Sequence, residues 1–237
     1  MKRLLLASAL AFIAIPASAQ KAPVPDLLQR AFTAPASKQL YAYDFEDVSD
    51  GGAEDKPRKS IVRGRVDPSR KKGDRVTITF AESTGGDEPA NPKKIDQRYE
   101  RNADGDIFCD SLSERAVTNV VDKGSGPAGR LFTFTPKAKS DADGQMKDIM
   151  KKMTAEAVID EATSTLRSFA ATLTKKHNVM LVAEIGAADM KVTCATALNG
   201  RAYTAKVEFN LSGSGMGQNF STKAVQTISN ITPVGQF

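Results

Sequence analysis

The sequence is poor in the side chains from which most catalytic and metal sites are built. It contains one histidine, two cysteines and no tryptophan among its 237 residues. A zinc site takes three or four His, Cys or carboxylate ligands, so this supply does not favour a zinc centre. The histidine, His177, stands in the segment KKHN with no G-x-S-x-G motif to indicate a hydrolase triad, and we expect it in a surface turn. We therefore predict no enzymatic activity and no cofactor.

Long apolar runs are missing after the first twenty residues. Lys2 and Arg3 precede an apolar run over residues 4–15, and the small residues of 17–19 follow it. A basic start, a short apolar segment and small residues before the cut are typical of a secretory signal peptide, and the run is shorter than the roughly 20 residues of a membrane span. The sequence predicts a signal peptide over 1–19, cut between Ala19 and Gln20. Residues 20–237 are then one exported domain, and we expect it in the periplasm with no transmembrane segment.

A strong charge of one sign is also missing. Removal of residues 1–19 leaves 31 basic and 28 acidic side chains, a net charge of +3, which does not indicate a nucleic-acid partner. Basic residues are densest between positions 56 and 75. This stretch is a candidate patch for an anionic surface or partner, or a solvated hairpin face. The candidate residues are Arg63, Arg65, Arg70, Lys71 and Lys72.

The two cysteines, Cys109 and Cys194, are compatible with two interpretations. An even number of cysteines in an exported chain favours a disulfide, which would close a loop of 85 residues. The alternative is two separate buried thiols, because no spacing rule fixes the pairing.

Alternation of apolar and polar residues predicts a mainly β (α+β) fold. Before residue 140 we expect strands over 39–48, 59–67, 74–81, 114–121 and 130–136, with a polar loop over 49–57. After residue 153 we expect a C-terminal meander of strands over 154–160, 164–173, 178–186, 190–198, 201–212 and 219–232. The predicted architecture is a single curved antiparallel sheet or half-barrel, with two or three short helices packed on its concave face.

The segment KVTCATALNGRAYTAKVEFN predicts the register of one hairpin. A two-residue Asn199-Gly200 turn suits a type I′ hairpin. The expected pairs are Leu198–Arg201, Thr196–Tyr203, Cys194–Ala205, Val192–Val207 and Met190–Phe209. One face of this hairpin is apolar and the other polar, as in a sheet with one covered face.

Short helices are predicted over 25–32, from Asn91 to about Arg101, and in the segment DGQMKDIMKKM. In the last of these, four apolar residues at positions i, i+3, i+4 and i+7 form one face. Methionine fills gaps in cores and also lines adaptable binding surfaces, so this face is either core or a cap over a ligand. The candidate residues facing an apolar ligand are Met146, Ile149, Met150, Met153, Tyr203, Val207 and Phe209.

The order of segments FTFTP, a helix, AEAVIDEATSTLRSFAATL, KVTCATALNGRAYTAKVEF and a final strand resembles the exported half-barrel proteins that include the periplasmic lipoprotein carriers. The resemblance implies an apolar concavity, capped by helices, that holds acyl chains. It assigns no role to individual residues. We expect an exported, non-enzymatic protein that binds or carries a lipid-like ligand. The alternatives are a structural or protein-interaction module of the envelope with a filled core, and an exported hydrolase that uses acidic residues or His177. The sequence does not indicate the oligomeric state.

Overall fold

The structure is a computed structural model that describes residues 25–33, 39–85, 99–100, 107–110, 117–136, 144–180, 183–196 and 200–236. The helices in these ranges are α1 (Asp26–Ala31) and α3 (Gly144–Lys151). The strands are β1 (Gln39–Ala53), β2 (Lys56–Val66), β3 (Val76–Thr84), β4 (Val117–Gly126), β5 (Gly129–Pro136), β6 (Met153–Asp160), β7 (Thr165–Leu173), β8 (His177–Met180), β9 (Ala183–Thr196), β10 (Ala202–Gly215) and β11 (Gln218–Gln236).

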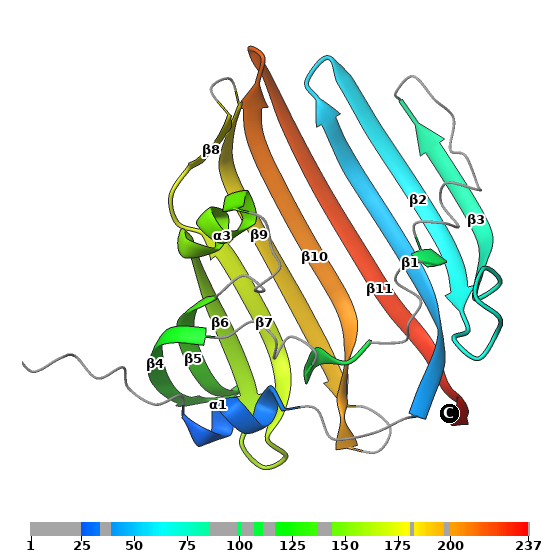
Figure 1. The fold of residues 1–237 in the computed structure, drawn as a ribbon, viewed down its shortest axis with the longest axis vertical. Helices are drawn as coiled ribbons and strands as arrows, with labels where there is room; N and C mark the ends of the chain where they lie inside the picture. Colours follow the sequence, from blue (N-terminus) through cyan, green and yellow to red (C-terminus); the bar gives the residue numbers. More distant parts are fainter. Residues whose placement is uncertain are drawn as a thin grey trace, which may run out of the picture.

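These strands form one open antiparallel sheet in the order β3-β2-β1-β11-β10-β9-β7-β6-β5-β4, with β8 paired to β9. The last strand, β11, therefore lies between β1 and β10 and joins the N-terminal strands to the C-terminal meander. Figure 1 shows the curved sheet with α1 and α3 on the same side. The predicted fold class, a mainly β half-barrel with short helices on one face, is confirmed.

Alternating burial defines this covered face, which we call the inner face. In β6, for example, Ala155, Ala157 and Ile159 are buried while the residues between them are more exposed. The inner face carries two core clusters. The first includes Leu28, Phe32, Cys109, Phe132, Phe134, Ala155, Ala157, Ile159, Leu166, Phe169 and Val192. The second comprises Tyr41, Tyr43, Phe45, Val62, Val66, Tyr99, Ile107 and Phe108.

Two predicted boundaries are wrong. The expected loop over 49–57 is instead the end of a long hairpin, because β1 runs to Ala53 and pairs with β2 as far as Lys56. The strands expected over 178–186 and 190–198 have other bounds in the structure. The short strand β8 ends at Met180, and the long strand β9 runs without a break from Ala183 to Thr196, pairing first with β8 and then with β7. In both places small or polar residues continue a strand, because the neighbouring strands supply its hydrogen bonds.

The predicted hairpin register is correct away from the turn and wrong beside it. Val192 pairs with Val207 and Met190 with Phe209, as expected. Between Thr204 and Lys206 the register shifts by one residue, so Ala205 is a bulge and Cys194 pairs with Thr204. Thr196 pairs with Ala202 instead of Tyr203, so five residues, 197–201, separate the last paired positions, and the connection is not the predicted two-residue turn.

A second bulge changes the position of Phe80. Arg63 pairs with Phe80, whereas the next residue, Gly64, pairs with Ile78. Thr79 is the extra residue, and Phe80 is moved to the outer face, where it is 40% exposed and lies 5.2 Å from the Arg63 guanidinium. Strict alternation along the strand predicted over 74–81 would place Phe80 on the face of Val76 and Ile78, and the bulge makes that placement wrong.

The predicted helix over 25–32 is confirmed by α1, in which Asp26 pairs with Arg30 at 3.1 Å. Of the helix predicted up to Arg101, only Tyr99 and Glu100 lie in the described part, and both are helical. The predicted signal peptide over 1–19 lies outside the described residues. In the described part of the chain, no helix has the length and apolar character of a membrane span.

Candidate functional site

The inner face is covered by α1 and residues 107–110 at one end of the sheet, and it carries half-buried apolar side chains towards the other end, where α3 lies (Figure 1). Successive rungs across β9, β10 and β11 lie beyond the core residues Val192 and Val207. The first rung is Met190, Phe209 and Ala224, the second is Ala188, Leu211 and Thr222, and the third is Ile185, Gly213 and Phe220. We call Ile185, Met190, Phe209, Leu211, Phe220 and Ala224 the inner apolar band. All six are half-buried.

Gly213 makes the third rung flat enough for an aromatic ring. A Cβ atom at this position would lie 2.7 Å from Cζ of Phe220 and 2.1 Å from the carbonyl oxygen of Glu184. The Phe220 ring therefore lies over the glycine, on the same face as Leu211. This close approach extends the inner apolar band to the end of the sheet.

The cover over the other end is fixed by a disulfide and a buried ion pair. Cys109 is bonded to Cys194 of β9, so the predicted disulfide is confirmed. The next residue, Asp110, accepts two hydrogen bonds from Arg201, from Nε at 2.9 Å and from Nη2 at 2.6 Å. The Arg201 guanidinium also lies 3.7 Å from the centre of the Phe108 ring. These contacts hold residues 107–110 against the start of β10.

Tyr99 and Glu100 cover the β1–β2 part of the inner face. The Tyr99 ring stacks on Phe45, with centroids 4.4 Å apart, and its hydroxyl donates to Asp47 Oδ2 at 2.6 Å. The Glu100 carboxylate accepts hydrogen bonds from the backbone N–H groups of Gly73 and Arg75. The cover is thereby tied to the loop between β2 and β3.

A cavity of about 170 Å³ lies beneath this cover. Tyr43 lines it together with Thr204 and Gln226, and burial raises the pKa of Tyr43 to about 12. The remaining lining residues are Phe45, Val66, Tyr99, Ile107 and Ile228. The volume is below the roughly 300 Å³ at which small-molecule pockets begin.

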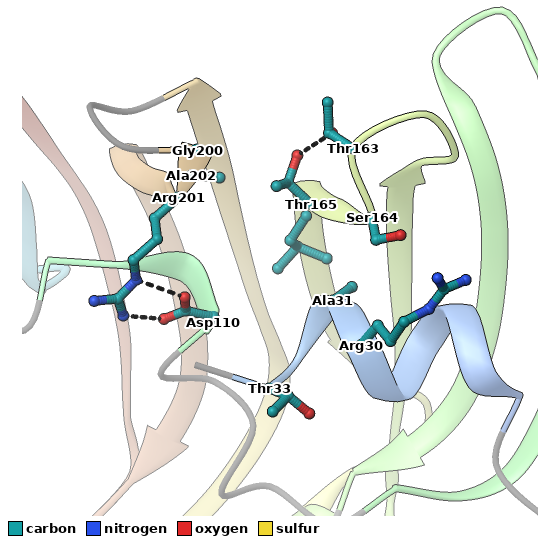
Figure 2. Close-up of a pocket in the computed structure, with 11 residues that line it drawn as sticks. Arg30, Ala31, Thr33, Asp110, Thr163, Ser164, Thr165, Gly200, Arg201 and Ala202 are labelled. Atoms are coloured by element: carbon teal, nitrogen blue, oxygen red, sulfur yellow. Dashed lines mark hydrogen bonds and ion pairs between the residues drawn. The ribbon is translucent and has the colours of Figure 1, made fainter. Parts of the chain in front are cut away.

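A second, polar pocket of about 190 Å³ lies at the covered end of the sheet, between α1, the β6–β7 turn and the start of β10 (Figure 2). Arg30 and the hydroxyl groups of Thr163, Ser164 and Thr165 line it on one side. Figure 2 shows the Arg201–Asp110 pair on the other side, where the two charges are already engaged with each other. Ala31, Leu166 and Ala202 complete the lining, so the pocket offers hydrogen-bonding groups beside apolar side chains.

The structure separates the predicted apolar ligand-facing residues into four groups. Met146, Ile149 and Met150 lie in α3 as predicted, but Met153 is the first residue of β6 and packs against the first core cluster, because the helix ends at Lys151. Val207 packs against the same cluster. The Ala205 bulge moves Tyr203 off the row of Val207 and Phe209, and Tyr203 packs against the second cluster. Only Phe209 lies in the inner apolar band.

The predicted basic patch is divided by ion pairing. Arg63 and Arg65 share the outer face, as the alternation predicts, and pair with Glu46 and Asp44 respectively. Hydrogen bonds from Asn230 and Arg65 lower the pKa of Asp44. The other predicted members lie in the β2–β3 loop, where Arg70 donates to the carbonyl oxygen of Asp74 at 3.4 Å and Lys71 and Lys72 are exposed.

His177 is not a surface turn residue, and that prediction is wrong. It begins β8, pairs with Ile185 and is 6% exposed, so it lies on the inner face at the end of the inner apolar band. Its Nδ1 atom is 3.2 Å from Nζ of Lys152, which follows α3. The lysines that precede His177 in the sequence indicate a solvated segment. They give no sign that the folded chain buries His177 or that Lys152, 25 positions away, contacts it. The described residues contain no group of three or more His, Cys, Asp or Glu side chains arranged to hold a metal ion.

No protein-family model matches this sequence, and no curated protein matches it. Among solved structures, the chain is similar to a DUF1329 family protein from Desulfovibrio piger, with 12% identity over 90% of this chain and 92% of that one, and a TM-score of 0.36. It is also similar to MucB in the MucA/MucB complex of Pseudomonas aeruginosa, with 9% identity over 89% of this chain and 98% of that one, and a TM-score of 0.22. At these scores the similarity carries no argument about function.

Proposed function

We propose that this protein is an exported, non-enzymatic envelope protein that binds a lipid-like apolar ligand on the inner face of its sheet. The inner apolar band is the observation that carries the proposal. Its side chains continue the core along the inner face, yet they are only partly buried. Full burial of one Leu or Phe side chain is worth about 1.5–3 kcal/mol, so an apolar molecule placed on the band gains part of this at each position.

The shape of the band favours an elongated ligand. From Phe209 to Gly213 the rungs extend over four residues, or about 14 Å along β10. The three strands that carry the band span about 10 Å across. An acyl chain that lies along the strands can contact this surface over about 14 Å of its length.

The protein-interaction alternative has support of its own. The two cavities described above, of about 170 and 190 Å³, are both smaller than a typical ligand pocket. A filled core beside the inner apolar band would also suit an envelope protein that holds an apolar segment of a partner. The two functions differ in what occupies the inner apolar band.

Variants on one strand test the proposal. Leu211→Glu places a charge in the band, whereas Ser212→Glu, the neighbouring residue on β10, places the same charge on the outer face. Delipidated wild-type protein and the Ser212 variant are expected to bind a fluorescent fatty acid, and the Leu211 variant is expected to lose most of that binding. Native mass spectrometry of protein isolated from its own envelope should show a bound lipid. Wild-type protein that binds no apolar probe and carries no lipid would reject lipid binding, and copurification of a stoichiometric protein instead would support the alternative.

A further inference from the structure

His177 carries a buried hydrogen-bonding atom that the described residues do not satisfy. Its Nε2 atom is buried and has no hydrogen-bond partner in the part of the chain that the structure describes. A buried polar atom without a partner costs about 1–3 kcal/mol and is uncommon in native proteins. A ligand that supplies the missing partner would recover this free energy.

The contact at the other ring nitrogen fixes what kind of partner is missing. Lys152 Nζ lies 3.2 Å from Nδ1 of His177. A lysine ammonium group has only donors, so Nδ1 accepts this hydrogen bond and the ring proton is on Nε2. The unsatisfied atom is therefore an N–H donor, and the missing partner is an acceptor such as a carboxylate oxygen.

The surroundings of His177 favour a negative charge. Residues 147–152 and 175–178 contain five lysines and one acid, Asp148. Lys151 lowers the pKa of Asp148, which keeps that carboxylate charged and engaged with a neighbour. Glu184 on β9 pairs with Lys176 at 2.8 Å. With five lysines against two carboxylates, this corner of the inner face has an excess of positive charge.

His177 also lies where the inner apolar band ends. Its partner in the sheet is Ile185, which belongs to the third rung with Gly213 and Phe220. An acyl chain that lies along the band from Phe209 towards this rung brings its terminal group to β8. The apolar surface and the acceptor-seeking donor thus meet at one place in the fold.

We propose that the ligand is a single-chain fatty acid, whose carboxylate accepts a hydrogen bond from His177 Nε2 and is charge-balanced by Lys152 while its chain lies on the inner apolar band. This inference rests on the proposed function and specifies its ligand. Contact requires the residues that bury the Nε2 atom to shift. The nearby helix α3 is eight residues long, a length at which a helix depends on its packing for stability.

Affinity measurements on matched variants test the carboxylate site. His177→Phe keeps a ring of similar size without the donor, and Lys152→Met keeps the length of the side chain without the charge. Each is expected to weaken palmitate binding by about tenfold or more, the effect of losing a hydrogen bond to a charged group. Binding of the neutral probe N-phenylnaphthylamine should stay within about twofold of wild type, because it does not use the donor. Lys176→Met, in the same lysine-rich segment but paired with Glu184, is the control and should change palmitate affinity by less than about threefold.

A second measurement uses the wild-type protein alone. The sequence has one histidine, so protein labelled with ¹⁵N-histidine gives one pair of ring nitrogen signals. Palmitate should shift the Nε2 signal, and the neutral probe should shift it much less. If wild-type protein binds the neutral probe while palmitate leaves Nε2 unmoved and His177→Phe retains palmitate affinity, the carboxylate site is wrong and the proposed function stands. If wild-type protein binds neither molecule, the proposed function itself fails.

Discussion

Replacement of Asp110 by alanine is expected to lower the free energy of unfolding by about 3–5 kcal/mol, because it leaves the Arg201 guanidinium buried without its counter-charge. The side chains of Arg201 and Asp110 are only 13% and 11% exposed, and the two hydrogen bonds between them measure 2.9 and 2.6 Å. Natural domains have a net stability of about 5–15 kcal/mol, so this single change removes a large part of it.

The expected loss depends on burial rather than on ion pairing itself. Arg130 and Asp122 form an ion pair in the β4–β5 hairpin, in which Nε and Nη2 of the arginine also contact the carboxylate but both side chains are more exposed, at 39% and 33%. Asp122→Ala is therefore the matched control, and we expect its effect to fall within the error of a denaturation experiment.

Urea unfolding, followed by circular dichroism, measures both changes. A double variant, Asp110→Leu with Arg201→Met, should recover much of the loss, because an apolar pair of similar size leaves no buried charge. The explanation from an uncompensated buried charge is wrong if Asp110→Ala lowers the free energy of unfolding by less than about 1 kcal/mol. It is also wrong if the double variant loses more free energy of unfolding than the sum of the losses of Asp110→Leu and Arg201→Met.

Three further predictions concern stability. The pKa of Tyr43 is raised to about 12 from an ordinary value of 10.0, so between these pH values the folded protein keeps a proton that the unfolded chain releases. The free energy of unfolding should therefore fall by about 2–3 kcal/mol as the pH rises from 10 to 12, and Tyr43→Phe should abolish this decrease in alkaline unfolding curves. Reduction of the Cys109–Cys194 disulfide opens a loop of 85 residues and should cost about 4–5 kcal/mol, measured by urea unfolding of a double alanine variant; a loss below about 1 kcal/mol would contradict the loop argument. Gly213→Ala should destabilise by about 1–3 kcal/mol because its Cβ meets the Glu184 carbonyl oxygen, whereas Gly126→Ala, whose Cβ would have only an ordinary 3.8 Å contact, should not differ measurably from wild type in the same assay.

Alternation of polarity was sufficient to predict the sheet and part of its register. The pairs Val192–Val207 and Met190–Phe209 follow from the sequence because one face is buried, and a slip by one residue would move every apolar side chain to water. The Ala205 bulge could not be predicted. The bulge lies where residues 107–110, which the disulfide links to β9, contact the start of β10. There the Thr204 N–H donates to the carbonyl oxygen of Ile107. Residues 107–110 are about 95 positions away in the chain.

The candidate site was less accessible to sequence reasoning than the fold. Phe209 was correctly placed towards the inner face, but Leu211 and Phe220 were not selected, because nothing in the sequence shows how far the cover reaches along a strand. His177 was assigned to the surface because its neighbours in the chain are lysines. The folded chain nevertheless buries it and brings Lys152, 25 positions away, to its Nδ1 atom.

The central place of β11 has a consequence for how the chain acquires its structure. Residues 39–66 cannot complete their hydrogen bonds to the rest of the sheet until residues near 230 are present, because β11 is the only strand between β1 and β10 in the described fold. Contacts so distant in sequence slow folding, since a long loop must close before they form. A chain synthesised from its N-terminus should therefore first form two separate hairpin systems with open edges, and these unite only when the final strand is complete.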